Sequence, residues 1–180
     1  MVVVKVGGGE ELTSALMEVV HKLVVENNMQ VYVEPSLKRA LPEVTKDLLT
    51  WPDEQKVCGP SRDGSGPREN AKCPNTTLCT IQCEPASGKC WRVVRPPRDI
   101  IANVDFVVTL GGDGTVLWVS SLLGNGPMPP MVTFAMGSLG FMTPYPSTSI
   151  KSCLTQVLKG RITLTVRHRL RCRIVRADPK

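Results

Sequence analysis

The sequence predicts an α/β fold in which a parallel sheet is flanked by helices. Short apolar runs rich in β-branched residues alternate with segments of helical periodicity, and strands in that order are joined by crossover helices. The runs carry few polar residues, as strands buried on both faces do. One of them, Val104–Leu110, ends in a glycine-rich turn that leads directly into a further helix.

The first part of the chain contains two strand–helix units. We expect strands at 1–6 and 30–33, and helices at 10–27 and 36–50. The first helix is indicated by leucines and valines at three- and four-residue spacing. Pro35 stops the second strand, Ser36 is the expected cap of the second helix, and Pro42 is expected to disturb its middle.

Regular patterning returns at Asn103 after a long irregular stretch. We expect strands at 104–110 and 131–136, and helices at 115–123 and from Ser147 or Ser149 to Lys159. From Ile162 to Ile174 apolar residues alternate with threonines and arginines. This period of two predicts an amphipathic strand of the antiparallel type.

Residues 52–98 show no periodicity and are rich in Pro, Gly, Ser and charges. Loops of this length are uncommon inside a compact domain, so we interpret the segment as an insertion, either functional or disordered. It holds five cysteines, namely Cys58, Cys73, Cys79, Cys83 and Cys90. They form no CxxC pair and no histidine lies among them, so we expect free thiols and no metal site.

Charge and hydropathy exclude several classes of protein. Of the net charge of +6, residues 159–180 carry a local excess of +7. Such a patch can bind nucleic acid, a membrane or phosphate, but a solvated strand face is the simpler interpretation, and we expect neither nucleic acid nor a membrane as partner. No segment approaches the roughly 20 apolar residues of a membrane span. The amino terminus lacks the features of a signal peptide, so a cytoplasmic location is expected.

The most informative segment is 106–118, in which Gly111, Gly112 and Gly114 surround Asp113. Glycines let the backbone approach a ligand, and the N–H groups that start a helix attract phosphate. No Lys or Arg lies within several residues of Asp113, so we expect its carboxylate to meet a hydroxyl or a metal beside a phosphate. A cap for the following helix is the alternative role for Asp113. Thr115 would donate its hydroxyl to phosphate or act as a cap.

Other nucleotide motifs are missing from the sequence. There is no GxxxxGK[ST] loop, and Gly7-Gly-Gly9 does not match GxGxxG. The two histidines, His21 and His168, are too few for a histidine-based triad or metal site, and we expect both to be structural.

The GGDG run at 111–114 and the run Phe134-Ala-Met-Gly-Ser-Leu-Gly-Phe-Met-Thr-Pro144 resemble motifs of the NAD kinases. The segment 160–180 is similar to plant and algal members. The resemblance covers residues 1–52 loosely and 103–180 closely. It implies a Rossmann-like N-terminal domain at 1–160, with 56–98 as a disordered insertion. It also implies that 161–180 begin a β-rich second domain.

The resemblance further implies a reaction and a set of site residues. The γ-phosphate of ATP passes to the 2′-hydroxyl of the adenosine ribose of NAD, with Mg²⁺ or another divalent ion, and Asp113 accepts the hydroxyl proton. The substrates NAD and ATP are the expected partners. The full-length protein is expected to form homo-oligomers. A plastid is the expected location if a transit peptide precedes this sequence. The expected contacts with NAD and ATP are Gly111, Gly112, Gly114, Thr115, Trp118, Gly137, Gly140 and Phe141.

Several alternatives stay open at this point. Phe141 and Trp118 are each candidates either for the dinucleotide pocket or for core packing. A lipid kinase of the diacylglycerol or sphingosine type carries a similar glycine loop, although residues 116–120 after the loop disfavour it. Because the chain ends where the second domain of the family begins, a truncated, non-catalytic nucleotide-binding domain is a further alternative.

Overall fold

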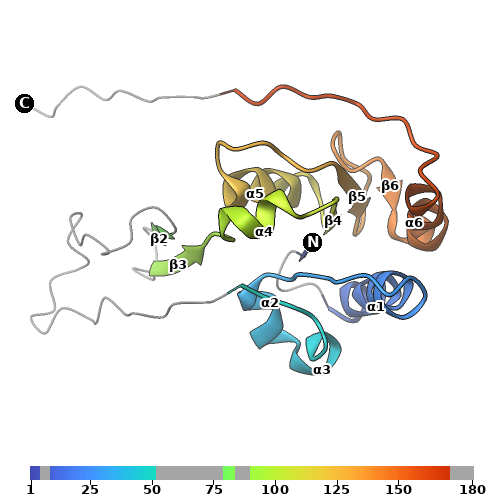
Figure 1. Ribbon diagram of the computed structural model, residues 1–180, viewed down its shortest axis with the longest axis horizontal. Helices are drawn as coiled ribbons and strands as arrows, with labels where there is room; N and C mark the ends of the chain where they lie inside the picture. Colours follow the sequence, from blue (N-terminus) through green and yellow to red (C-terminus); the bar gives the residue numbers. More distant parts are fainter. Residues whose placement is uncertain (5–8, 52–78, 84–89, 171–180) are drawn as a thin grey trace, which may run out of the picture.

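The protein is built around one parallel sheet. The computed structural model describes residues 1–4, 9–51, 79–83 and 90–170, with only the backbone described for 79–83 and 90–94. Its four strands lie in the order β1-β4-β5-β6 (Figure 1). They are β1 (Val2–Val4), β4 (Val107–Leu110), β5 (Met131–Ala135) and β6 (Tyr145–Pro146), and every neighbouring pair is parallel. The predicted α/β class is therefore confirmed.

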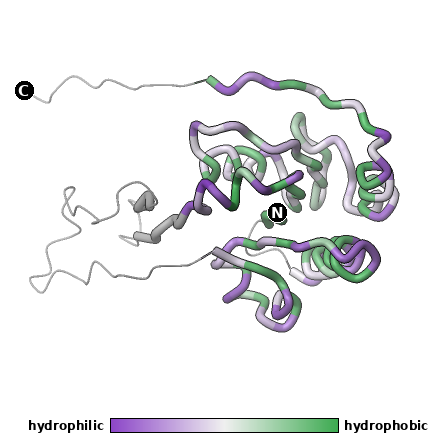
Figure 2. Tube along the Cα trace, in the orientation of Figure 1, coloured by the Kyte–Doolittle hydropathy of each residue, from purple (hydrophilic) through white to green (hydrophobic). Residues whose placement is uncertain are grey.

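Two helical layers cover the two faces of this sheet. On one face, α1 (Glu10–Val20) packs beside α6 (Ile150–Leu158) over a core that includes Val2 and Leu110. On the other face, α5 (Asp113–Leu123) and α4 (Arg98–Ala102) lie over a core that includes Val3 and Val107. Successive strand residues point to opposite faces, so a continuous apolar run supplies both layers. In Figure 2 the short strand β1 beside the amino terminus is green, the colour of hydrophobic residues.

The first predicted helix is confirmed, although its end has a different form. After Val20 the helix continues as the π-helical turn η1 (His21–Val25). The predicted strand at 30–33 is wrong in extent, because only Tyr32 and Val33 form parallel bridges, to Leu49 and Val2. The chain enters a helix at Pro35, which leaves no room for a longer ladder.

The second predicted helix is two short helices, α2 (Pro35–Ala40) and α3 (Pro42–Thr45). Pro42 begins the second of them, since proline has no N–H for the preceding turn and suits a first helical position. The cap prediction is wrong. Glu34 is the N-cap residue, and the buried Ser36 hydroxyl has no hydrogen-bond partner in the described part of the chain.

The predicted insertion contains an antiparallel pair of strands where we expected no regular structure. Strand β2 (Cys79–Cys83) pairs with β3 (Cys90–Val94). Both contain β-branched residues, which favour strands. Helix α4 was also unforeseen. The side chains of all five cysteines of this segment lie outside the described residues, and so does the rest of 52–89.

The second half follows the prediction closely until α6. Helix α5 begins at Asp113, two residues early, and ends at Gly124, whose φ is +68°. A 3₁₀ turn, η2 (Ser147–Ser149), precedes α6. The predicted strand from Ile162 is wrong for the described part, because residues 161–170 run extended with no paired neighbour and all their side chains are exposed. Alternation alone creates no ladder, since a strand needs a second strand to bond.

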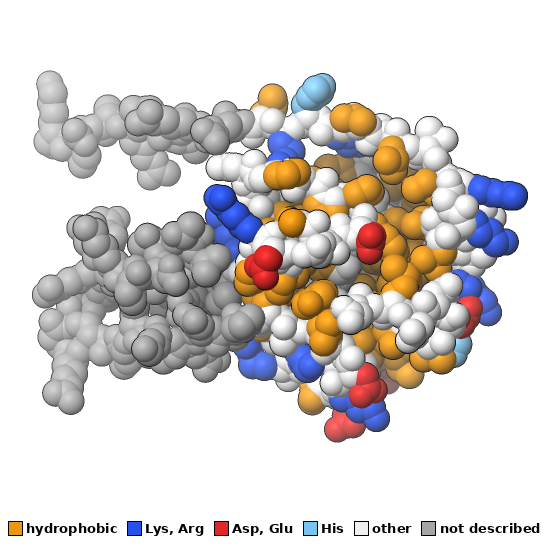
Figure 3. All heavy atoms as spheres, in the orientation of Figure 1, with side chains coloured by type: hydrophobic (Ala, Val, Ile, Leu, Met, Phe, Trp, Pro, Cys, Tyr) orange, Lys and Arg blue, Asp and Glu red, His pale blue; other side chains and the backbone are white. Residues whose placement is uncertain are grey.

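Two features are missing from the described residues. No helix among them is long and apolar enough to cross a membrane, and no group of three or more His, Cys, Asp or Glu side chains gathers there to hold a metal. On the face shown in Figure 3 the Lys and Arg side chains lie mainly around the periphery, while hydrophobic side chains gather toward the centre.

Candidate functional site

The two glycine-containing segments meet at the carboxyl edge of the sheet. Gly111 and Gly112 follow β4 directly, and Asp113 is the first residue of α5. The turn at 136–144 follows β5, which is the neighbour of β4. Because carboxyl ends of parallel strands share one edge, residues almost 30 positions apart come together where α/β sheets bind ligands.

Asp113 joins these two segments through hydrogen bonds. Its Oδ2 accepts from the backbone N–H of Phe141 at 3.0 Å. Its Oδ1 accepts from the N–H of Met142 at 2.9 Å and from the Thr143 hydroxyl at 3.3 Å. The alternative in which Asp113 merely caps α5 is therefore wrong. Gly112 is the N-cap residue, and no side chain caps this helix.

These donors stabilise the ionised form of Asp113. The hydrogen bond from Met142 N–H, followed by those from Phe141 and Thr143 and by the positive charge of Arg167, holds the pKa of this carboxyl below its ordinary value, against an opposing desolvation effect. Asp113 is thus an anion at neutral pH and ready to accept a proton, at a modest basicity set by the donors around it.

Two of the predicted glycines are required by close approach. A Cβ on Gly111 would lie 2.1 Å from the Thr115 Oγ1, and its φ is +155°. A Cβ on Gly140 would lie 2.2 Å from Asp113 Oδ1. By contrast, nothing lies within 4 Å of a Cβ built on Gly112, Gly114 or Gly137. Gly111 and Gly140 thus allow the two segments to pack together, whereas Gly112, Gly114 and Gly137 face open space among the described residues.

Thr115 lies in the first turn of α5 with its side chain buried. Its Oγ1 has no hydrogen-bond partner among the described residues. A buried hydroxyl without a partner is costly unless a ligand supplies one. The free N–H groups at the start of α5 lie in the same turn. The contact between Thr115 and a phosphate stays a prediction.

The two aromatic candidates differ in environment. The Phe141 side chain is 81% exposed, so the core-packing alternative for Phe141 is wrong. The Arg167 guanidinium lies 4.5 Å from its ring centroid and donates to its carbonyl at 3.3 Å. Trp118 is half-buried and packs against the core beneath α5. Its indole Nε1 donates to Oε2 of Glu34 at 3.1 Å.

Three residues near the site were not predicted from the sequence. Thr143 lies within the run 134–144 singled out from the sequence, and its place in that run is the only sequence feature that points to it. Arg167 was assigned to a solvated strand face, and Glu34 has no local signal, since its contact with Trp118 spans 84 positions. A neighbouring arginine, Arg169, donates to the carbonyls of Gly124 and Gly126 beyond the end of α5.

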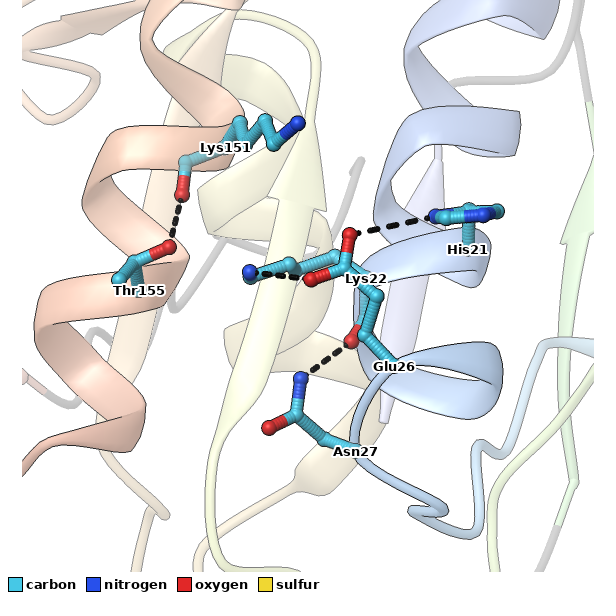
Figure 4. Close-up of polar contacts among 6 residues, drawn as sticks. All are labelled: His21, Lys22, Glu26, Asn27, Lys151 and Thr155. Atoms are coloured by element: carbon cyan, nitrogen blue, oxygen red, sulfur yellow. Dashed lines mark hydrogen bonds and ion pairs between the residues drawn. The ribbon is translucent and has the colours of Figure 1, made fainter.

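The histidines take no part in this arrangement. His21 pairs with Glu26 at 3.4 Å on the surface of α1 and η1, and Lys22 donates to the same carboxylate at 2.6 Å (Figure 4). The hydrogen bond from Lys22 holds the pKa of Glu26 below its ordinary value. His168 is exposed on the segment 161–170.

Comparison with known proteins gives consistent matches. The family model of the ATP-NAD kinase N-terminal domain matches residues 1–162. A probable NAD kinase 1 of Oryza sativa is 58% identical over 90 residues, which are 50% of this chain and 17% of that protein. A putative NAD kinase 3 of the same plant is 33% identical over 163 residues, or 88% of this chain and 24% of the relative. The chain thus spans about a quarter or less of these relatives.

A solved structure shares the fold. The crystal structure of yeast NADH kinase complexed with NADH superimposes with a TM-score of 0.52 at 26% identity. The match covers 89% of this chain and 38% of the yeast chain.

Proposed function

We propose a function for this chain from its membership of the NAD kinase family, to which it belongs as the N-terminal domain. It forms the part of an NAD-phosphorylating enzyme that carries the catalytic aspartate. The reaction transfers the γ-phosphate of ATP to the 2′-hydroxyl of the adenosine ribose of NAD and yields NADP and ADP. The observation that carries the proposal is the ionised Asp113 carboxylate, held between two glycine segments at the carboxyl edge of the sheet.

Asp113 is assigned the role of proton acceptor. A ribose hydroxyl is a weak nucleophile, and a carboxylate within hydrogen-bond reach takes its proton as the new O–P bond forms and the bond to ADP breaks. The lowered pKa keeps Asp113 in the required charged state. Its position at the start of α5 places it beside N–H groups that attract phosphate.

The phosphate chain of ATP is assigned to the first turn of α5. Gly112 and Gly114 leave the approach open there, and the Thr115 hydroxyl in the same turn has no hydrogen-bond partner among the described residues. A divalent ion would neutralise charge on the transferred phosphoryl group. Both oxygens of Asp113 already accept N–H donors, so the described residues fit Mg²⁺ that enters with ATP and keeps its waters, not an ion held by a protein cage.

The adenine of NAD is assigned to the exposed ring of Phe141, and Gly137 and Gly140 allow the dinucleotide to approach that turn. Trp118 is assigned to the wall of the same pocket. We place the full-length enzyme in the cytoplasm, or in a plastid where a transit peptide precedes it, and expect a homo-oligomer. The relatives described above are NAD or NADH kinases and give the lipid kinase alternative no support.

The test is Asp113→Asn in a complete enzyme that carries this domain. Asparagine keeps the shape of the side chain and removes its basicity, so turnover is expected to fall about 10²–10⁴-fold while NAD affinity changes little. Asp47→Asn is the control, since Asp47 is exposed on the turn after α3. Near-normal turnover in the Asp113 variant would remove this residue from the reaction.

A further inference from the structure

We propose that Thr143 is a positioning residue, which fixes the orientation of the Asp113 carboxylate through its side-chain hydroxyl. The catalytic consequence of this inference rests on the proposed function. The positioning itself does not, because it concerns contacts within the domain.

The Thr143 hydroxyl lies between a donor and an acceptor. The side chain is fully buried. Its Oγ1 accepts from the N–H of Gly140 at 3.0 Å and lies 3.3 Å from Asp113 Oδ1. A hydroxyl has one proton to donate. Since Gly140 N–H is itself a donor, that proton is directed at the carboxylate of Asp113.

The packing around this hydroxyl fixes its direction. A Cβ on Gly140 would lie 2.6 Å from Thr143 Oγ1 and 2.2 Å from Asp113 Oδ1, so the three groups are in close contact. The same turn is tied to β5 at a second point, where the Thr133 hydroxyl donates to the carbonyl of Met142 at 2.6 Å. Thr133 therefore holds the turn through the carbonyl of Met142, whereas Thr143 links the turn to the carboxylate of Asp113.

The two carboxylate oxygens of Asp113 thereby become unequal. Oδ1 accepts from both Met142 N–H and Thr143. Among the described residues, Oδ2 accepts from one donor, the N–H of Phe141, whose side chain is exposed. The geometry thus assigns Oδ2 to the substrate hydroxyl and Oδ1 to the protein. Loss of the Thr143 hydroxyl lets the carboxylate rotate and raises its affinity for protons, since a donor to the charged form is lost.

The experiment follows the backbone amide resonances of Phe141 and Met142 by NMR as the 180-residue chain is titrated with acid. These amides report protonation of the carboxylate that they bond. In Thr143→Val, which has nearly the same shape, the titration midpoint is expected to move to higher pH than in the parent. Thr143→Ser should restore the parent midpoint. Thr133→Val is the matched control, because it removes a buried hydroxyl of β5 that bonds the same turn at the carbonyl of Met142 and not at Asp113.

An unchanged midpoint in Thr143→Val, or a shift that Thr143→Ser fails to reverse, would overturn the proposal. If valine prevents folding, Thr143→Ala carries the same comparison. In a complete enzyme, Thr143→Val is expected to lower kcat roughly 10- to 100-fold with the KM for NAD little changed, because the base is misplaced and not the substrate. If Asp113→Asn keeps near-normal turnover, the proposed role of Asp113 as proton acceptor fails, while the amide titration still decides whether Thr143 positions its carboxylate.

Discussion

The indole Nε1 of Trp118 donates a hydrogen bond to Oε2 of Glu34 at 3.1 Å, across 84 positions of the chain. Trp118 lies in the second turn of α5, and Glu34 is the N-cap residue of α2. The hydrogen bond joins α5, the helix after the glycine loop, to the start of α2. Both residues follow strand residues at the carboxyl edge of the sheet, where the candidate site lies.

Trp118→Phe is expected to destabilise the domain by about 1 kcal/mol, because phenylalanine keeps the ring packing but leaves Glu34 without its donor. Urea unfolding of Trp118→Phe, Glu34→Ala and the double variant measures the coupling between the two residues. Strictly additive effects would show that the hydrogen bond contributes nothing to stability.

Gly140→Ala is expected to destabilise the fold by about 1–3 kcal/mol, because the added methyl group would overlap Asp113 and Thr143. Gly112→Ala is the matched control. Gly112 lies on the opposite side of the same site, its φ is −95°, and a Cβ there meets open space. The midpoint of urea unfolding should fall for the first variant and stay near the parent value for the second. Equal effects would contradict the packing described around Asp113.

Acid should weaken the fold partly through Asp113. The hydrogen bond from Met142 N–H lowers the pKa of this carboxyl in the folded state. A depressed folded pKa contributes stability that is present above the unfolded value of about 3.9 and is lost as the pH falls through the folded value. The difference in unfolding free energy between the parent and Asp113→Asn should therefore shrink as the pH falls through the unfolded value of about 3.9 and below it. A difference independent of pH would show that the carboxylate gains nothing from these donors.

The 180-residue chain alone is expected to show little or no NAD kinase activity and to self-associate. It spans 38% of the yeast NADH kinase chain, and its segment 161–170 exposes apolar side chains, with Val166 at 84% and Leu170 at 88%. Exposed apolar surface favours association, and the arginines of the same segment oppose it until salt screens them. The measurement is an assay with ATP, NAD and Mg²⁺ beside light scattering at low and high salt. A monodisperse monomer with ordinary turnover would contradict both expectations.

Much of the architecture follows from local patterns in the sequence. The apolar runs that became β1, β4 and β5 carry enough β-branched residues to specify strands, and the three- and four-residue spacing of α1 specifies a helix. Gly124 ends α5 and Pro42 divides the second helical segment, because each acts through its own backbone geometry. Such features depend on neighbours in the chain, and a single sequence is sufficient to show them.

The sequence by itself therefore determined the α/β class and pointed to Asp113, and the tertiary structure decided what Asp113 contacts. Its donors, Phe141 and Met142, lie 28 and 29 positions away, and only the adjacency of β4 and β5 brings them together. The reverse holds for the strand expected from Ile162. Its alternation was genuine, but a ladder requires a paired strand, and the described residues offer none at 161–170. Periodicity states which face of a segment is apolar, whereas pairing depends on which other segment lies beside it.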